Sequence, residues 1–146
     1  MKKLVHIVCI ILVCSLICTV PAQAASAGES RASAFFSSHG TDLYKTSSSS
    51  FQIWFDVVAN AARMDVLGVS EITVYRSADG QSWSKMGTYL MEYNPQMVAQ
   101  NTTSHDGYVT YNYATTGYYY TARVTFYAKN STGTGVLDEY TEIIRM

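Results

Sequence analysis

The sequence has few of the residues that crosslink a chain, ligate metals or bind polyanions. Its three cysteines lie at positions 9, 14 and 18, so no thiol remains after residue 24. The 122 residues that follow have eight basic and eleven acidic side chains, which gives a formal charge of −3. The missing thiols exclude a disulfide scaffold, a thiol enzyme and a cysteine-ligated metal site, and the charge excludes a strongly basic nucleic-acid binder. A chain of this length has room for one domain with a single core.

The first 24 residues have the composition of an export signal. Two lysines precede an apolar run at positions 4–20, and Ala22 and Ala24 are the small residues that a signal peptidase reads. We therefore expect a signal peptide at residues 1–24. One alternative is a retained membrane anchor, because about 17 apolar residues approach the length that spans a bilayer. The other is a lipoprotein acylated at Cys18.

Cleavage after Ala24 predicts a secreted protein, free or associated with the cell surface, without a permanent membrane anchor. Residues 25–34 are small and polar with no apolar periodicity, which is typical of a flexible leader. Residues 35–146 are then the folded domain.

The domain shows the period-two alternation of apolar and polar residues that is typical of strands. The Asp79-Gly80 pair suits a tight turn and predicts a hairpin between residues 71–76 and 84–91. Residues 91–106 lack alternation, and we expect a long connection there with a helical turn near residues 95–100. The other predicted strands cover residues 51–58, 108–113, 118–129 and 136–144. Six or seven strands in about 110 residues indicate an all-β fold, a single antiparallel β-sandwich.

Two segments resemble known domains. Residues 72–77, followed by Asp79-Gly80 and Trp83, are similar to the strand, turn and tryptophan of fibronectin type III-like and immunoglobulin-like domains. Residues 118–128 are similar to the tyrosine-led sixth strand of the same domains. The resemblance implies the fold and no activity, because such sandwiches have many unrelated functions.

A second resemblance extends over most of the domain. It is similar to a group of small uncharacterised secreted proteins of Gram-positive gut bacteria. This resemblance implies an exported single domain and supplies no catalytic residues. The residues that carry it are Met64-Asp65, Leu67-Gly68, Glu71-Ile72, Trp83, Tyr93-Asn94-Pro95, Ser104-His105 and the segment 120–126.

Candidate catalytic and metal-binding residues are few. Ser104-His105-Asp106 has the residue types of a hydrolase triad, but neighbouring side chains on extended backbone point to opposite faces. The sequence has no spacing typical of a zinc or calcium site, and we expect no metal and no cofactor. The segment from Ser77 to Trp83 resembles one aspartate box of a sialidase, and a single copy predicts a hairpin turn and not a propeller.

The candidate binding residues are aromatic. If the strand with Tyr75 lies beside the strand with Tyr119 and Tyr127, the three rings share an outer sheet face with Arg123, and they suit a carbohydrate or protein ligand. Arg123 is also expected to pair with Glu139 or Glu142 on a neighbouring strand. Tyrosines that simply cover the sheet are the alternative interpretation. Trp54 falls opposite the core face of its strand, where it is either a ligand platform or, after a slip in register, a core residue.

These observations predict a monomeric, non-enzymatic extracellular interaction module. Its expected partner is a glycan, a wall polymer or another protein, and no nucleic acid. Two alternatives stay open: a small secreted hydrolase that uses His105 with loop carboxylates, and a purely structural envelope component.

Overall fold

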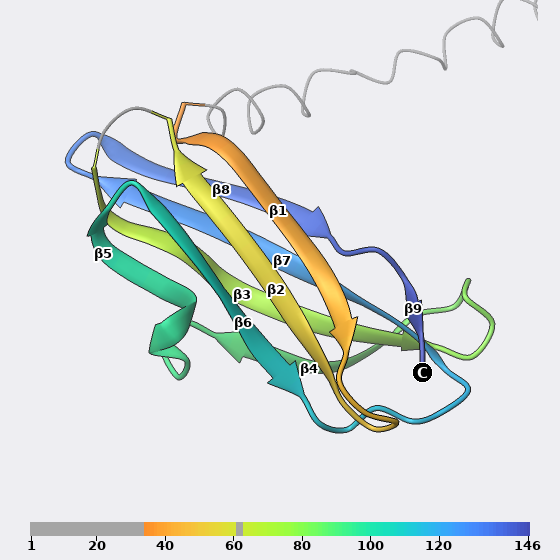
Figure 1. The fold of residues 1–146 in the computed structure, drawn as a ribbon. Helices are drawn as coiled ribbons and strands as arrows, with labels where there is room; N and C mark the ends of the chain where they lie inside the picture. Colours follow the sequence, from red (N-terminus) through yellow and green to blue (C-terminus); the bar gives the residue numbers. More distant parts are fainter. Residues whose placement is uncertain (1–33, 61–62) are drawn as a thin grey trace, which may run out of the picture.

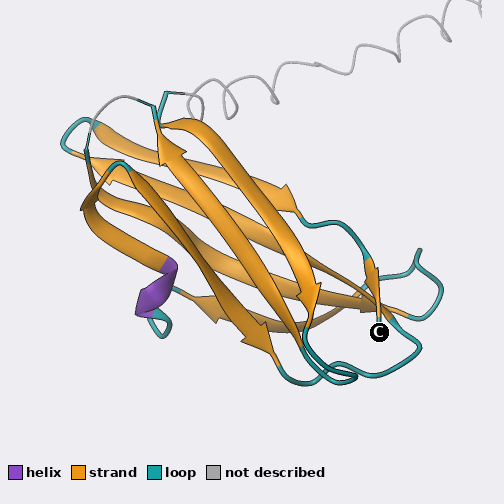
Figure 2. Cartoon of the chain, in the orientation of Figure 1, coloured by secondary structure: helices purple, strands orange, loops and turns teal. Residues whose placement is uncertain are grey.

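The computed structural model describes residues 34–60 and 63–146. The expected signal peptide with Ala22 and Ala24, and the leader up to residue 33, lie outside the described residues. Within the described residues the chain forms nine strands and one short 3-10 helix (Figure 2). The elements are β1 (Phe36–Lys45), β2 (Phe51–Ala59), β3 (Met64–Ser77), β4 (Ser84–Leu90), η1 (Pro95–Met97), β5 (Val98–Thr102), β6 (Ser104–Tyr111), β7 (Tyr119–Asn130), β8 (Gly133–Tyr140) and β9 (Ile144–Arg145).

The strands form two antiparallel sheets that face each other (Figure 1). The small sheet has the order β1-β2-β6. The large sheet has the order β4-β3-β7-β8, with β5 on β3 and β9 on β7. β4 and β5 share one edge of β3, because β7 pairs along the other edge. The predicted all-β sandwich is confirmed.

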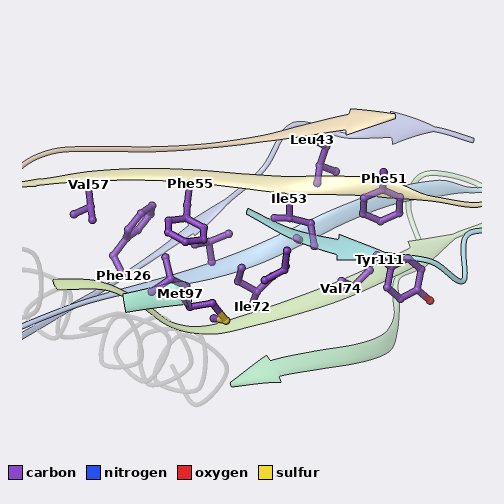
Figure 3. Packing of buried hydrophobic residues seen from close by; sticks show 14 of the residues in the cluster. Leu43, Phe51, Ile53, Phe55, Val57, Ile72, Val74, Met97, Tyr111 and Phe126 are labelled. Atoms are coloured by element: carbon purple, nitrogen blue, oxygen red, sulfur yellow. The ribbon is translucent and has the colours of Figure 1, made fainter. Parts of the chain in front are cut away.

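The core lies between the sheets and follows the predicted alternation in β2 and β7. Figure 3 shows Ile53 and Phe55 of β2 pointing toward Ile72 of β3 and Phe126 of β7. Burying each large apolar side chain contributes about 1.5–3 kcal/mol. The alternate residues that are at most 2% exposed are Phe51, Ile53, Phe55 and Val57 in β2, and Tyr120, Ala122, Val124, Phe126 and Ala128 in β7.

The predicted hairpin is confirmed: β3 and β4 pair antiparallel across the Asp79-Gly80 turn. Gly80 has a φ of +74°, a conformation that glycine adopts without strain. The Asp79 carboxylate accepts hydrogen bonds from the backbone N–H groups of Ser82 and Gln81, both at 2.8 Å, and from the Ser77 hydroxyl at 2.7 Å. These bonds hold the pKa of Asp79 well below its usual range. The segment that resembles an aspartate box is therefore a turn.

The predicted long connection at residues 91–106 is wrong in part. A helical turn is present as η1, but β5 follows it and β6 begins at Ser104. β5 pairs with the first part of β3, and the backbone at the junction of η1 and β5 passes so close to Gly68 that a Cβ there would collide with the Met97 carbonyl oxygen. β5 has two apolar residues followed by three polar ones, and none of the five is fully buried, so apolar and polar side chains do not alternate along it. For this reason the sequence pattern gives no sign of the strand.

The predicted last strand, residues 136–144, is two strands in the structure. The interruption is at Thr141, whose hydroxyl accepts a hydrogen bond from the Ala122 N–H at 2.9 Å. The Thr141 N–H in turn donates to the Ala122 carbonyl at 2.9 Å. A side chain thus takes the place of a ladder partner between β8 and β9. This division and β5 explain why the described residues form more strands than the six or seven predicted.

Candidate functional site

The outer face of the small sheet has a row of three aromatic side chains, one from each strand, which we call the aromatic platform: Tyr44 of β1, Trp54 of β2 and Tyr108 of β6. The register places Trp54 directly opposite Tyr108, and their ring centroids are 4.7 Å apart. The Tyr44 ring meets the Trp54 ring edge-on at 6.1 Å. Neighbouring strands lie about 4.8 Å apart, so the platform crosses the whole width of the sheet.

The platform is accessible to a ligand. Tyr44 is 53% exposed and Tyr108 is 44% exposed, whereas Trp54 between them is half-buried. The indole N–H of Trp54 donates a hydrogen bond to the Gln52 side-chain oxygen at 3.1 Å, which fixes the ring. Tyr44, Gln52 and Trp54 line a hollow of about 390 Å³. The structure therefore places Trp54 on an outer face and not in the core.

Three carboxylates lie beside the platform on the same face. Asp56 of β2 lies directly opposite Asp106 of β6, and Asp42 of β1 lies opposite Trp54. All three line one hollow of about 390 Å³ together with Tyr44 and Trp54. Within the described residues, none of the three forms an ion pair.

Two local features shape this hollow. Gly40 lies opposite Asp56, and a Cβ at this position would approach the Asp56 Oδ1 to 2.8 Å, so the missing side chain leaves room for the carboxylate. Asp42 raises the pKa of the Tyr44 hydroxyl, through a side-chain hydrogen bond and then through its negative charge.

The three tyrosines predicted to form a binding face lie on the outer face of the large sheet. Tyr119 and Tyr127 belong to β7 and are eight positions apart, which is about 26 Å along a strand. Tyr75 of β3 lies near the Tyr119 end, opposite Thr121. The structure thus brings Tyr75 and Tyr119 to one end of the sheet and Tyr127 to the other.

All three of these rings are half-buried, and two have partners within the protein. The Tyr75 ring packs near Tyr140, with centroids 6.3 Å apart. The Arg145 guanidinium lies over the Tyr119 ring at 5.3 Å. A hollow of about 370 Å³ near Tyr75 and Tyr140 also includes Trp83, a ring that sequence reasoning did not select as a site residue.

Arg123 lies between the two ends of this face. It donates a hydrogen bond to Glu71 at 2.7 Å, and its guanidinium is 3.9 Å from Asp138. Glu71 also accepts a hydrogen bond from the Thr73 hydroxyl at 2.8 Å. The Thr73 hydrogen bond and Arg123 together lower the pKa of Glu71. This cluster places a cation between the two carboxylates at the centre of the large sheet's outer face.

The expectation that Arg123 pairs with Glu139 or Glu142 is wrong. The register of β8 places Asp138 opposite Thr125, on the outer face with Arg123, whereas Glu139 lies opposite the buried Val124. Glu139 instead approaches His39 of β1 at 2.7 Å and so connects the edges of the two sheets. Glu139 is one position from Asp138, and a shift of one position along a strand moves a side chain to the opposite face.

His105, the candidate catalytic histidine, lines a hollow of about 730 Å³ that Asp106 also lines. Its Nε2 donates to the Gln96 carbonyl oxygen at 3.0 Å, and its ring lies 5.7 Å from the Phe55 ring. Within the described part of the chain, no serine or carboxylate forms a hydrogen bond with His105. The geometry attaches η1 to the small sheet and does not form a nucleophile–base pair.

Two further observations concern residues 34–60 and 63–146. These segments contain no group of three histidine, cysteine, aspartate or glutamate residues arranged to hold a metal ion. They also contain no helix that is long and apolar enough to cross a membrane.

Comparison with known proteins gives a distant structural neighbour. No protein family and no curated protein matches the sequence. The fold is similar to that of the sporulation control protein Spo0M from Bacillus subtilis, with a TM-score of 0.42 and 9% sequence identity. The match covers 74% of this chain and 47% of that chain, so the chain spans about half the length of Spo0M. The function proposed next rests on this chain's own residues.

Proposed function

We propose that the chain is a secreted, non-enzymatic module that binds a glycan through the aromatic platform. The observation that carries the proposal is the row of three rings from three strands on one accessible face. A rigid sheet holds these rings, so little side-chain freedom is lost when a ligand binds. Pyranose rings have an apolar C–H face that stacks on aromatic rings and hydroxyl groups at their edges.

The polar residues around the platform suit the hydroxyl groups of a sugar. Gln52 and Thr110 lie opposite each other on one side of the ring row, and Asp56 and Asp106 lie opposite each other on the other side. Amide, hydroxyl and carboxylate groups donate and accept hydrogen bonds in a plane beside the stacked ring. A protein ligand would instead favour an extended apolar centre with few charges.

The location and the finer fold type belong to the same proposal. The lysine pair, apolar run and small-residue site in residues 1–24 support export, and the absence of cysteine after residue 24 makes folding independent of the redox compartment. Pairing of β1-β2-β6 against β4-β3-β7-β8, with the hairpin turn before Trp83, supports a fibronectin type III-like sandwich.

A glycan array with the purified protein tests the proposal. We expect a defined set of positive glycans, and Trp54→Ala should weaken their binding by roughly 30-fold, or about 2 kcal/mol, as expected for a central aromatic contact. Tyr127→Ala on the large sheet is the matched control and should bind as the wild type does. Circular dichroism confirms that both variants are folded.

Four outcomes would contradict the proposal. The wild type could show no glycan signal, or Trp54→Ala could leave the signal unchanged. Loss of binding in Tyr75→Ala and Tyr119→Ala with full binding in Trp54→Ala would move the ligand to the large sheet. Cleavage of a bound glycan that disappears in His105→Ala would favour the hydrolase alternative.

A further inference from the structure

The outer face of the small sheet is acidic as well as aromatic. Among its outward-facing positions in β1, β2 and β6 there is no lysine or arginine, whereas three positions are aspartates: Asp42, Asp56 and Asp106. These carboxylates share one hollow with the rings of Tyr44 and Trp54. A ligand seated on the platform therefore lies within the field of uncompensated negative charge.

The two sheets differ in how they treat carboxylates that lie near each other. On the large sheet, Arg123 lies between Glu71 and Asp138, so each carboxylate has a cation beside it. On the small sheet, Asp56 lies directly opposite Asp106, an arrangement of like charges that destabilises a sheet, and residues 34–60 and 63–146 supply no ion-pair partner for either. A positive charge on the ligand would stabilise Asp56 and Asp106 on the small sheet, as Arg123 stabilises Glu71 and Asp138 on the large sheet.

We propose that the ligand of the platform is a glycan with free, protonated amino groups, such as a polymer of glucosamine residues. This inference rests on the proposed function and names the ligand class of the same site. The apolar face of the sugar ring stacks on Trp54, and its ammonium group lies between the carboxylates. The ammonium group also gains from the electron-rich faces of Trp54 and Tyr44, because a cation within about 6 Å of an aromatic ring is attracted to it. An anionic wall polymer would be repelled by the same carboxylates.

The test compares two oligosaccharides of equal length, a fully deacetylated glucosamine oligomer and its N-acetylated counterpart, by isothermal titration calorimetry with the full protein. We expect the deacetylated oligomer to bind at least tenfold more tightly. The preference should shrink when NaCl is raised from about 50 mM to about 500 mM, because salt screens exposed charges. The double variant Asp56→Asn and Asp106→Asn should lose the preference and still bind the N-acetylated oligomer. Asp138→Asn on the large sheet is the control that keeps the preference.

The outcomes separate this inference from the proposed function. Equal or tighter binding of the N-acetylated oligomer, still dependent on Trp54, overturns the amino-sugar assignment and leaves glycan binding standing. Binding of a lysine oligomer as tight as that of the glucosamine oligomer, with the same dependence on the two aspartates, overturns the glycan in favour of a cationic peptide. A preference that survives in the double variant also overturns the inference, because the carboxylates would then have no part in it.

Discussion

The outer faces of the two sheets hold similar residue types in opposite arrangements. On the large sheet, several charges and rings have partners within the protein: Arg123 binds Glu71, and Arg145 covers Tyr119. On the small sheet, three aspartates have no ion-pair partner within the described residues, and the flanking rings of the platform are about half exposed. The large face is therefore more complete in itself than the small face.

This difference indicates that the outer face of the large sheet serves stability and that the outer face of the small sheet serves binding. A face that serves only stability is expected to pair its charges, whereas a binding site carries groups that are satisfied only when the ligand arrives. The pairing of Asp56 with Asp106 works against folding. We therefore interpret the outer face of the small sheet as the functional one, and the following variants test this contrast.

The largest effect is expected in the core that both faces share. Phe126 of β7 is 0% exposed, and Phe126→Ala should lower the free energy of unfolding by about 3–5 kcal/mol, because it removes buried area and leaves a cavity. Urea denaturation measures the change.

Two tryptophans allow the same experiment to follow the sheets separately, because Trp54 lies in β2 and Trp83 directly precedes β4. In single-tryptophan versions made with Trp83→Phe or Trp54→Phe, the two fluorescence transitions should coincide, as expected for one cooperative unit. Transitions at different urea concentrations would show that the two faces belong to independently unfolding layers.

A smaller effect is expected when the large face loses Arg123. Arg123→Ala leaves Glu71 and Asp138 as uncompensated neighbours, and the free energy of unfolding should fall by about 1 kcal/mol, in keeping with a half-exposed pair. Glycan binding on the small sheet should not change. Loss of glycan binding in a folded Arg123→Ala protein would show that the large face contributes to the site.

The next prediction concerns the free energy of unfolding at low pH. Thr73 and Arg123 lower the pKa of Glu71 in the folded state, below its ordinary value of 4.5, so the carboxylate stabilises the fold above about pH 4.5. This contribution is lost as the pH falls through the lowered pKa. Glu71→Gln should therefore be less stable than the wild type by less than about 1 kcal/mol at pH 7, and the difference should shrink at pH 3. A difference that is unchanged by pH would exclude ionisation of Glu71 as its source.

Much of the fold could be predicted from the sequence because strong alternation reports one buried face directly. This holds for residues 51–58 and 118–129, and for the hairpin at Asp79-Gly80. The strand β5 could not be found, because its partly exposed, polar residues follow no period of two. Its position depends on close backbone contact at Gly68, which is a tertiary effect.

The candidate site could be predicted only in part, for a related reason. Alternation in β2 places Trp54 on an outer face, but Tyr44 and Tyr108 join it only through the pairing of β1 and β6 with β2. The residues of a single strand do not determine its register with the neighbouring strands. The same limit explains the incorrect partners of Arg123, since a shift of one residue in β8 exchanges Asp138 for Glu139.

The smallest expected effect is the most specific for the contrast between the faces. Asp106→Asn removes one of two like charges that lie directly opposite each other, so it should raise the free energy of unfolding by about 0.5 kcal/mol. The gain should diminish at high salt, and Asp65→Asn, at an exposed position of β3, is the control without such a gain. The same variant should bind the glucosamine oligomer more weakly, so that stability rises while binding falls. If Asp106→Asn instead lowers stability, the carboxylate has a structural partner and the small face is as complete as the large one.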